Sequence, residues 1–369
     1  MMKKELVVSA PGRICLFGEH QDYFGLPIVA AAINLRITIR GTSRKDPRIH
    51  IRLPDIEEED EFPIGGHIPY VKKRDYLRSA VNVLSRKGVR FRSGWDCELR
   101  GTIPINAGTS SSSALVVAWI KFLLEASGPG PLNTPEEIAE LGFLAEVAEF
   151  QEPGGKMDHY ASALGGIVAV SFDDGLHVER LPNPLKTFVL ADSLQKKDTT
   201  GMLAYIKTHV LEGVRKIQKT HPEFNLKRPL DEDIEERIRR LPPNERRLLS
   251  GTLKTRDLTV MGRALFRSPE FDHTRFGELL SLQQDVLREY LRTSTPKIDR
   301  MIEGALEAGA LGAKINGSGG GGCVFAYAPE NPEEVAEALR RTGAEAHIVR
   351  VDGGARVEPP ARQMSVEGS

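Results

Sequence analysis

The spacing of apolar and polar residues predicts strands in the first part of the chain and helices in most of the rest. Residues 27–41, PIVAAAINLRITIRG, end in regular alternation of apolar and polar side chains, which is typical of a half-buried strand. Residues 6–10 and 14–17 are short apolar segments separated by a Pro-Gly pair, so two strands joined by a turn are expected. Further strands are expected at 95–103, 165–172 and 186–193.

Helical periodicity follows in several later regions. Residues 74–86 place their apolar side chains on one face. The segment TPEEIAELGFLAEVAEF begins with Thr134 as N-cap, Pro135 at the first helical position and Glu137 three residues after the cap, which together predict a capping box. From about Thr199 the pattern is helical and charged. It is interrupted by the glycine-rich segment KINGSGGGGCVFAYAP and closed by the strand-like segment AHIVRV.

A change in composition near residues 182–184 marks the expected domain boundary. We therefore predict an N-terminal domain over residues 1–183 and a C-terminal domain over residues 184–355. The tail, residues 356–369, contains glycine, proline and charge without periodicity and is expected to be frayed. The acidic run DIEEEDE, residues 55–61, is expected to form a solvated loop.

Composition narrows the class of protein. The 369 residues are 40% hydrophobic and 27% charged, so the chain can bury a sizeable core, and its net charge of −1 gives no electrostatic case for binding nucleic acid or an anionic membrane. No apolar run approaches the roughly 20 residues that span a bilayer. Cys15, Cys97 and Cys323 lie in apolar segments without paired spacing, so reduced core cysteines in a cytoplasmic enzyme are expected.

A loop of small residues runs directly into an apolar helix. It consists of Gly108, Thr109, Ser110, Ser111, Ser112 and Ser113. The free N–H groups and positive dipole end at the start of a helix favour a phosphate, and serine hydroxyls add donors or ligands for Mg²⁺. A flexible linker is the alternative, but a linker has no reason to adjoin an apolar helix.

A second loop is rich in glycine. It consists of Gly317, Ser318, Gly319, Gly320, Gly321 and Gly322. Ordering consecutive glycines costs conformational entropy, which is understandable where the backbone passes close to a ligand or to another loop. The segment is neither a Walker motif nor the first glycine-rich turn of a dinucleotide-binding fold, and a purely structural turn stays open as an alternative.

Two further groups of polar residues are candidates for chemistry. Glu146 and Asp158 are 12 positions apart, and a Pro-Gly-Gly turn between them could bring the carboxylates together for magnesium binding and for accepting a proton. A pair of acids on the surface of helices is the alternative. The segment GEHQDYFG, residues 18–25, places five polar side chains at the end of an apolar strand.

Three motifs together resemble the GHMP kinase superfamily. They are APGRICLFGEHQDYFGLPIVAAAI, PINAGTSSSSAL and GAKINGSGGGGCVFAY, in the order found in the family, and the likeness extends over roughly residues 5–350. The resemblance implies an α+β fold of two domains. The N-terminal, ATP-binding domain would be related to domain 2 of ribosomal protein S5, and the C-terminal domain would be ferredoxin-like, with a left-handed crossover.

The resemblance also implies roles for individual residues. Asp158 would match the family's catalytic base and Arg13 the cation beside it. Ser112, or its neighbour Ser111, would coordinate Mg²⁺ together with Glu146. The ATP phosphates would contact the loop formed by Gly108, Thr109, Ser110, Ser111, Ser112 and Ser113. The sugar would be bound by Glu19, His20, Asp22 and Tyr23. The glycine loop, with Gly317, Gly319, Gly320 and Gly321, would support the phosphate loop and close the pocket.

The expected activity is transfer of the γ-phosphoryl group of MgATP to a sugar, with the anomeric hydroxyl of galactose or a related sugar as the expected acceptor. The first motif and the Met-Asp pair at Asp158 resemble galactokinase, whereas the C-terminal half reads more like mevalonate kinase. Phe24-Gly25-Leu26 departs from the Asn-Gly-Gly usual in galactokinases, so the identity of the sugar stays open. A mevalonate-type kinase of isoprenoid synthesis and a non-catalytic ATP and sugar sensor are the alternatives, and either a monomer or a homodimer is compatible with the sequence.

Overall fold

An eight-stranded sheet with helices on one face forms the first half of the molecule. The computed structural model describes residues 4–359 except 106, 173 and 197–198. The path of the sheet is β12-β1-β2-β5-β3-β4, and β6 pairs with both β2 and β7. Its strands are β1 (Glu5–Phe17), β2 (Ile28–Ser43), β3 (Arg48–Leu53), β4 (Glu58–Pro63), β5 (Trp95–Gly101), β6 (Ile167–Ser171), β7 (His177–Leu181) and β12 (Arg356–Val357). The helices are α1 (Tyr76–Arg86), α2 (Ser111–Ser127), α3 (Pro135–Phe143) and α4 (Met157–Leu164).

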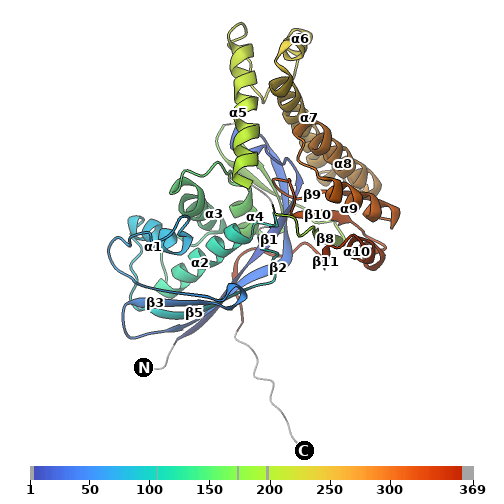
Figure 1. The fold of residues 1–369 in the computed structure, drawn as a ribbon. Coiled ribbons are helices and arrows are strands. Elements are labelled where there is room, and N and C mark those ends of the chain that lie inside the picture. The colour runs from blue at the N-terminus through green and yellow to red at the C-terminus, as the bar shows by residue number, and fades with distance from the viewer. Residues whose placement is uncertain (1–3, 106, 173, 197–198, 360–369) are drawn as a thin grey trace, which may run out of the picture.

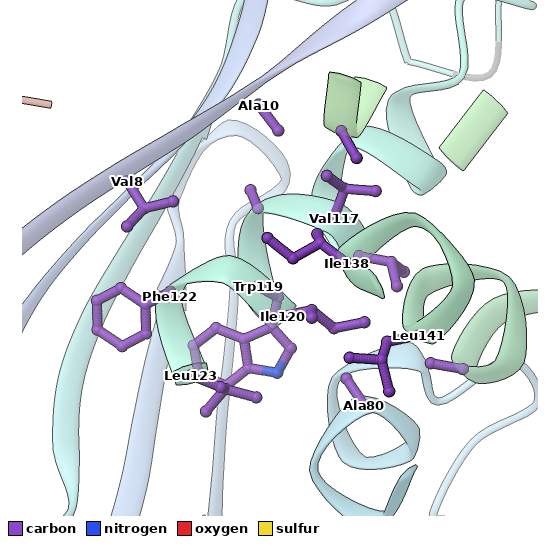
Figure 2. Packing of buried hydrophobic residues seen from close by; sticks show 14 of the residues in the cluster. Val8, Ala10, Ala80, Val117, Trp119, Ile120, Phe122, Leu123, Ile138 and Leu141 are labelled. Atoms are coloured by element: carbon purple, nitrogen blue, oxygen red, sulfur yellow. The ribbon is translucent and has the colours of Figure 1, made fainter. Parts of the chain in front are cut away.

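Helix α2 lies at the centre of the first core because its sequence is apolar on nearly every face. Its Trp119 and Phe122 stack with ring centroids 5.5 Å apart. Figure 2 shows side chains of α2 between strand residues such as Val8 and helix residues such as Leu141 of α3. The predicted capping box at the start of α3 is confirmed, since Thr134 and Glu137 satisfy each other's backbone N–H groups. Because α2 is packed into the core, it fixes the position of the serine loop that precedes it.

A smaller antiparallel sheet forms the second half. Its order is β11-β8-β10-β9, with β8 (Phe188–Asp192), β9 (Gly312–Ile315), β10 (Cys323–Tyr327) and β11 (Glu345–Val349). The first connection contains the helices α5 (Thr199–Gln218), α6 (Glu232–Arg240), α7 (Pro243–Phe266), α8 (His273–Asp285) and α9 (Pro296–Glu307), and the last contains α10 (Pro332–Arg341). With these helices the strands follow the β-α-β-β-α-β order of a ferredoxin-like domain, which confirms the predicted fold class. The domain boundary proposed at 183/184 lies in the connection between β7 and β8.

The two sheets are joined at the long strands β1 and β2. Figure 1 shows α1 to α4 gathered on one side of these strands and the second sheet with α7 to α10 on the other. Helix α5 contacts α7, and both project away from the sheets. No helix in the described part of the chain is long and apolar enough to cross a membrane. Cys15, Cys97 and Cys323 are all buried, and no two of them form a disulfide.

The two short strands expected at residues 6–10 and 14–17 are a single strand, β1, in the structure. It runs without a break from Glu5 to Phe17, and the Pro-Gly pair produces a shift of register against β2 between Pro11 and Arg13. Proline cannot donate to the ladder, and the N–H of Arg13 donates to the carbonyl oxygen of Thr109 at 3.3 Å instead. The irregularity therefore attaches β1 to the serine loop.

The acidic run at residues 55–61 was expected to be a loop, and this is wrong for most of it. Residues 58–61 belong to β4, which pairs with β3 in antiparallel register at the edge of the sheet. Phe62 on β4 is buried, and Glu61 accepts from Arg48 of β3 at 2.9 Å. The three glutamates of this segment are exposed on an outer strand, where charge discourages edge-to-edge pairing with another chain, whereas Asp60 pairs with the buried Arg78.

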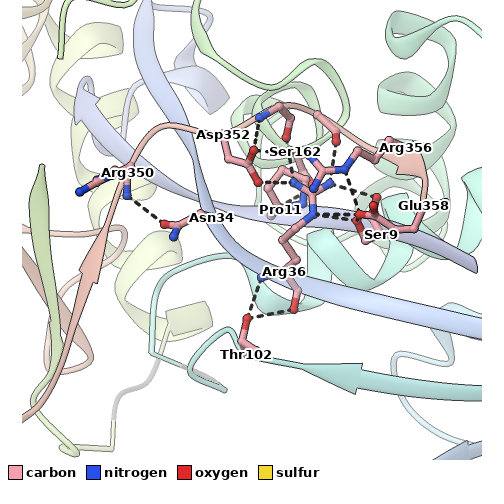
Figure 3. A network of polar contacts seen from close by, with 12 residues as sticks. Ser9, Pro11, Asn34, Arg36, Thr102, Ser162, Arg350, Asp352, Arg356 and Glu358 are labelled. Carbon is pink, nitrogen blue, oxygen red and sulfur yellow. Dashed lines mark hydrogen bonds and ion pairs between the residues drawn. The ribbon is translucent and has the colours of Figure 1, made fainter. Parts of the chain in front are cut away.

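The tail was expected to be frayed from residue 356, and this is wrong for its first residues. Residues 356 and 357 form β12, which pairs with β1, and residues 360–369 lie outside the described residues. Arg36 of β2 holds this segment by donating to Asp352 at 2.7 Å and to the carbonyl oxygen of Gly354 at 2.7 Å. Figure 3 shows Arg36 at the centre of a polar network that includes Ser9 and Glu358. The chain thus returns to the first sheet after the second is complete.

Candidate active site

A cavity of about 230 Å³ opens where β1, α2, α4 and the glycine loop meet. Most of the residues predicted from sequence line it: Arg13, Glu19, His20, Asp22, Tyr23, Gly108, Ser110, Ser111, Ser112, Ser113, Glu146, Asp158 and Gly317. Four predicted residues do not: Thr109, Gly319, Gly320 and Gly321. Segments from five separate parts of the chain therefore converge on one site.

Arg13 and Asp158 form an ion pair inside this cavity. The Nε and Nη2 atoms of Arg13 both lie 2.8 Å from Oδ1 of Asp158. Nη1 of Arg13 donates to the carbonyl oxygen of Gly108 at 2.6 Å, so the guanidinium also contacts the serine loop. Burial alone would raise the pKa of Asp158, but the charge and hydrogen bond of Arg13 outweigh it and hold the pKa below its ordinary value. Asp158 is consequently a carboxylate, able to accept a proton.

The serine loop presents donors to the cavity. Gly108 and Ser110 both have positive φ, at 93° and 58°, which turns the chain sharply into α2. Helix geometry leaves the N–H groups of residues 111–113 without intrahelical acceptors. Oγ of Ser110 is buried, and its hydroxyl helps to lower the pKa of Asp158. Open N–H groups at a helix start, with serine hydroxyls beside them, suit a phosphate oxygen. Thr109, by contrast, is buried and donates to the carbonyl oxygen of Pro104.

The glycine loop packs against the serine loop. A side chain at Gly317 would come within 2.9 Å of the carbonyl oxygen of Gly108, and φ at Gly317 is 80°. The N–H of Cys323 donates to the carbonyl oxygen of Ala107 at 2.6 Å. Gly320 instead donates to Thr293, behind the cavity wall. Only the beginning of the glycine loop therefore borders the cavity.

Asn316, just before the glycine loop, was not predicted as a site residue. Its Nδ2 donates to the carbonyl oxygens of Gly108 at 3.0 Å and Arg13 at 3.3 Å, and its Oδ1 accepts from the N–H of Cys15 at 2.9 Å. One buried amide thus joins β1 and the serine loop. Its position inside the third motif is the one feature of the sequence that could have identified Asn316 as a site residue.

Glu146 lies on a π-helical turn, Leu144–Ala148, that continues α3. Its Oε2 is 2.8 Å from Nε2 of His159, a second residue that the sequence analysis did not predict. His159 follows Asp158 directly, so α4 contributes both side chains. Among the described residues no three His, Cys, Asp or Glu side chains cluster to hold a metal ion. One carboxylate with serine hydroxyls and phosphate oxygens is nevertheless the kind of partial ligand set that Mg²⁺ accepts.

Asp22 is on the short 3-10 turn Asp22–Phe24, and its side chain lies against the first turn of α4. Its Oδ2 accepts from the N–H of Met157 at 3.1 Å and its Oδ1 from the N–H of Tyr23 at 3.0 Å. Burial raises the pKa of Asp22, and the neighbouring charge of Asp158 adds to the effect. Gly155 is required here, because a side chain would come within 2.0 Å of the Asp22 carboxylate.

His20 and Tyr23 bind each other on the cavity wall. Nδ1 of His20 lies 2.9 Å from the hydroxyl of Tyr23, and Nε2 lies 3.1 Å from the carbonyl oxygen of Ser318. Since a carbonyl only accepts, Nε2 of His20 donates the hydrogen bond to Ser318. Burial raises the pKa of Tyr23 well above its usual value. These two side chains therefore attach the GEHQDYFG segment to the glycine loop.

Glu19 is buried beside them, and its partner was not predicted. Oε1 forms an ion pair with Lys314 of β9, and both side chains are completely inaccessible to solvent. Lys314 lies in the quoted motif GAKING, but nothing in the sequence shows which residue it faces.

Family comparisons agree with this geometry. Residues 75–166 match the GHMP kinases N terminal domain and residues 263–345 match the GHMP kinases C terminal family. The mevalonate kinase of Thermococcus sibiricus is 30% identical over 96% of this chain and 98% of its own length. The chain is a GHMP kinase. Members of this family are ATP-dependent kinases, so ATP is the cosubstrate of this enzyme.

Within the family this kinase is similar to relatives with different acceptors. Residues 2–42 match the galactokinase galactose-binding signature. The galactokinase of Actinobacillus succinogenes is 29% identical over 88% of this kinase and 86% of the relative. A crystal structure of Lactococcus lactis galactokinase complexed with galactose superposes with a TM-score of 0.83 at 21% identity, covering 96% of this chain and 95% of that one. The structural likeness establishes the shared fold.

Proposed function

We propose that this GHMP kinase transfers the γ-phosphoryl group of ATP to the anomeric hydroxyl of galactose or a closely related sugar. The observation that carries the proposal is the Arg13–Asp158 ion pair in one cavity with the polar side chains of residues 19–23. The galactose-binding signature covers both Arg13 and this polar segment. The residues proposed as base, as phosphate-binding helix start and as acceptors for sugar hydroxyls thus line one cavity.

Asp158 is proposed to act as the general base. Its carboxylate accepts the proton of the attacking hydroxyl while the sugar oxygen bonds to the γ-phosphorus and the bond from that phosphorus to the bridging oxygen of ADP breaks. Arg13 keeps Asp158 ionised and lies close enough to the serine loop to stabilise negative charge on the transferred group. Asp158 is partly exposed, with 30% of its side chain accessible, so a substrate can reach it.

The phosphates of ATP are proposed to bind at the start of α2, on the N–H groups and hydroxyls of residues 110–113. Ser112, or Ser111 beside it, would hold Mg²⁺ together with Glu146. When bound, the cation neutralises charge on the phosphates. His159 would hold the Glu146 carboxylate in place through its hydrogen bond at 2.8 Å.

The sugar is proposed to lie against Glu19 and Asp22. Carboxylates accept hydrogen bonds from sugar hydroxyls, and both residues line the cavity. His20 forms hydrogen bonds with Tyr23 and with the carbonyl oxygen of Ser318. We therefore propose that His20 and Tyr23 form the wall of the sugar pocket.

The direct test is ADP release by the purified enzyme with ATP, Mg²⁺ and a panel of free sugars that includes galactose, with mevalonate as comparison. We expect turnover with galactose or a close analogue and none with mevalonate. Turnover with mevalonate alone would overturn the sugar assignment. Saturable binding of ATP and sugar without ADP above background would instead identify a sensor.

A mevalonate-type kinase is the second candidate, because relatives of that activity match this chain as well as galactokinases do. Against it stand Arg13, where mevalonate kinases normally carry lysine, and the Asp22-Tyr23 pair. The same assay distinguishes the two activities.

A further inference from the structure

A second hollow, of about 520 Å³, lies between the start of α7 and the end of the π-helical turn Val286–Leu291 that continues α8. Seven residues line it: Pro243, Asn244, Arg246, Arg247, Ser250, Tyr290 and Arg292. None of these residues lines the cavity that contains Asp158. The volume is within the range of about 300–1,000 Å³ that is usual for pockets that bind small molecules. The protein therefore has a second hollow that is large enough for a small ligand.

Three of the lining residues are arginines without an acidic partner. Arg246, Arg247 and Arg292 form no ion pair within the described part of the chain, although all three line the hollow. The acids nearest to them along the chain, Glu245 and Glu289, form ion pairs with other cations, which are Lys216 and Arg288. The positive charge in the hollow is therefore not balanced by the protein itself.

The hydrogen bonds of these guanidinium groups go to neutral acceptors. Nη1 of Arg246 donates to the carbonyl oxygen of Arg239 at 3.1 Å, and Nη1 of Arg247 donates to the carbonyl oxygen of Tyr290. An arginine side chain carries five N–H donors, so each of the two retains donors that these carbonyl oxygens do not use. Donors and positive charge are thus both available to a ligand in the hollow.

Arg247 and Arg292 lie close enough to repel each other. Burial and the positive charge of Arg292 lower the pKa of Arg247, and only the hydroxyl of Tyr205 acts in the opposite direction. No carboxylate contributes to this balance. Two cations held together without a counter-charge are stabilised by an anion that binds beside both of them.

We propose that this hollow binds a small anion that carries two linked phosphate groups. Guanidinium groups donate to phosphate oxygens through pairs of parallel N–H groups, so an arginine cluster suits phosphate. One phosphate ester carries about −1.5 to −2 charges at pH 7, fewer than the three positive charges here, and two linked groups therefore match the site better. Asn244 and Ser250 add neutral hydrogen-bonding groups to the same hollow. The inference does not depend on which acceptor the kinase phosphorylates.

The experiment is calorimetric titration of the whole kinase with inorganic pyrophosphate, at constant ionic strength and without divalent cations. The proteins compared are the wild type, Arg247→Gln and Arg292→Gln. We expect each substitution to weaken one binding component by about 10- to 100-fold, as for the loss of a hydrogen bond between charged groups. Arg292 is exposed and outside the active-site cavity, so Arg292→Gln should fold and should release ADP at the wild-type rate.

Arg288→Gln is the matched control. Arg288 lies on the same π-helical turn, is exposed, pairs with Asp285 at 2.8 Å and does not line the hollow. The substitution removes the same charge as Arg292→Gln. Because solvent and salt screen a charge outside the hollow, we expect it to weaken pyrophosphate binding by less than about threefold.

Hydrogen–deuterium exchange locates the bound anion, because pyrophosphate can also bind at the start of α2. In the wild type, pyrophosphate should protect the backbone amides of residues 243–250 and 286–293. This protection should be lost in Arg292→Gln at the same pyrophosphate concentration. Protection of residues 108–114 would report the active site and should be the same in both proteins.

Equal pyrophosphate binding by the wild type and both hollow variants, or an equal loss in Arg288→Gln, would overturn the inference. Protection confined to residues 108–114 would also overturn it. Absence of turnover with any sugar, in a protein that still binds pyrophosphate in the hollow, would refute the proposed function alone. The two failures can therefore be distinguished.

Discussion

At the scale of single residues, neighbouring charges decide what each carboxylate in the cavity can do. Asp158 and Asp22 are both partly buried, and burial acts on the pKa of both in the same direction. Arg13 reverses the effect at Asp158 through direct contact, whereas Asp22 receives only backbone N–H groups. The pKa is therefore lowered at Asp158 and raised at Asp22, although both residues line the same cavity.

Replacement of Asp158 by asparagine tests its role as base. The variant keeps the shape of the side chain but cannot take a proton, so we expect kcat to fall by about 10²–10⁴-fold while ATP binding is retained. The measurements are steady-state ADP release and calorimetric titration with ATP. Asp257→Asn, at an exposed residue of α7 outside the cavity, is the control. Near-normal turnover in Asp158→Asn would place the base elsewhere.

The influence of Arg13 on Asp158 predicts a dependence on pH. The base form of Asp158 exists above its pKa, which Arg13 holds below the ordinary value, so wild-type kcat/KM should not fall through this group until the pH drops below the range in which aspartates ordinarily titrate. In Arg13→Gln the largest effect that opposes burial is removed, so the pKa of Asp158 rises. The acidic limb of the kcat/KM profile should therefore move to higher pH, on top of a general loss of activity. An acidic limb at the same pH in both proteins would contradict this coupling.

At the scale of elements, the turn into α4 positions both acids. Gly154 and Gly155 precede the helix, and Asp22 accepts from its first turn at Met157. The two glycines differ in their surroundings, because a side chain at Gly154 would meet Val147 at 3.5 Å, an ordinary contact, whereas one at Gly155 would overlap Asp22. This contrast supplies a matched pair of variants.

Gly155→Ala should displace the Asp22 carboxylate and weaken sugar binding. We expect KM for the sugar to rise about tenfold, the cost of roughly one hydrogen bond, with KM for ATP nearly unchanged. Gly154→Ala should leave both constants close to those of the wild type. Equal effects of the two substitutions would show that the turn, and not Asp22, is responsible.

At the scale of the whole molecule, the chain crosses between its two sheets several times around the cavity. Asn316 and Lys314 of the second sheet bind β1, and residues 352–358 return to the first sheet after β11 is complete. The site is thus assembled from both domains. Arg36 is the residue that holds the returning segment (Figure 3).

Arg36→Met should destabilise the protein by about 2 kcal/mol, because several hydrogen bonds to a charged, largely buried group are lost together. The measurement is the free energy of unfolding in urea. Arg40→Met on the same strand is the control: Arg40 is half exposed and pairs with Glu5 at the surface, so its loss should cost less than about 1 kcal/mol. Similar losses in the two variants would show that the network does not hold the tail.

Patterns local in sequence predicted much of this protein correctly. The alternation in β2, the capping box at Thr134 and the serines that open α2 depend on neighbours along the chain, and the structure has each of them where it was expected. The residues of the cavity were found by motif for the same reason, since Arg13, Glu146 and Asp158 lie in distinctive short segments.

Only the tertiary structure decided what depends on contacts between distant segments. The acidic strand β4 and the returning strand β12 exist because β3 and β1 provide partners for them, and neither has a local apolar pattern strong enough to predict it. Lys314 and Glu19 are 295 positions apart, and His159 and Glu146 meet only because α3 and α4 pack together. The sequence by itself determined the family, the two-domain fold and the candidate chemistry, since these follow from short-range patterns. The ionisation of Asp158, the partner of Glu19 and the path of the tail depend on burial and on pairs of charges that only folding brings together.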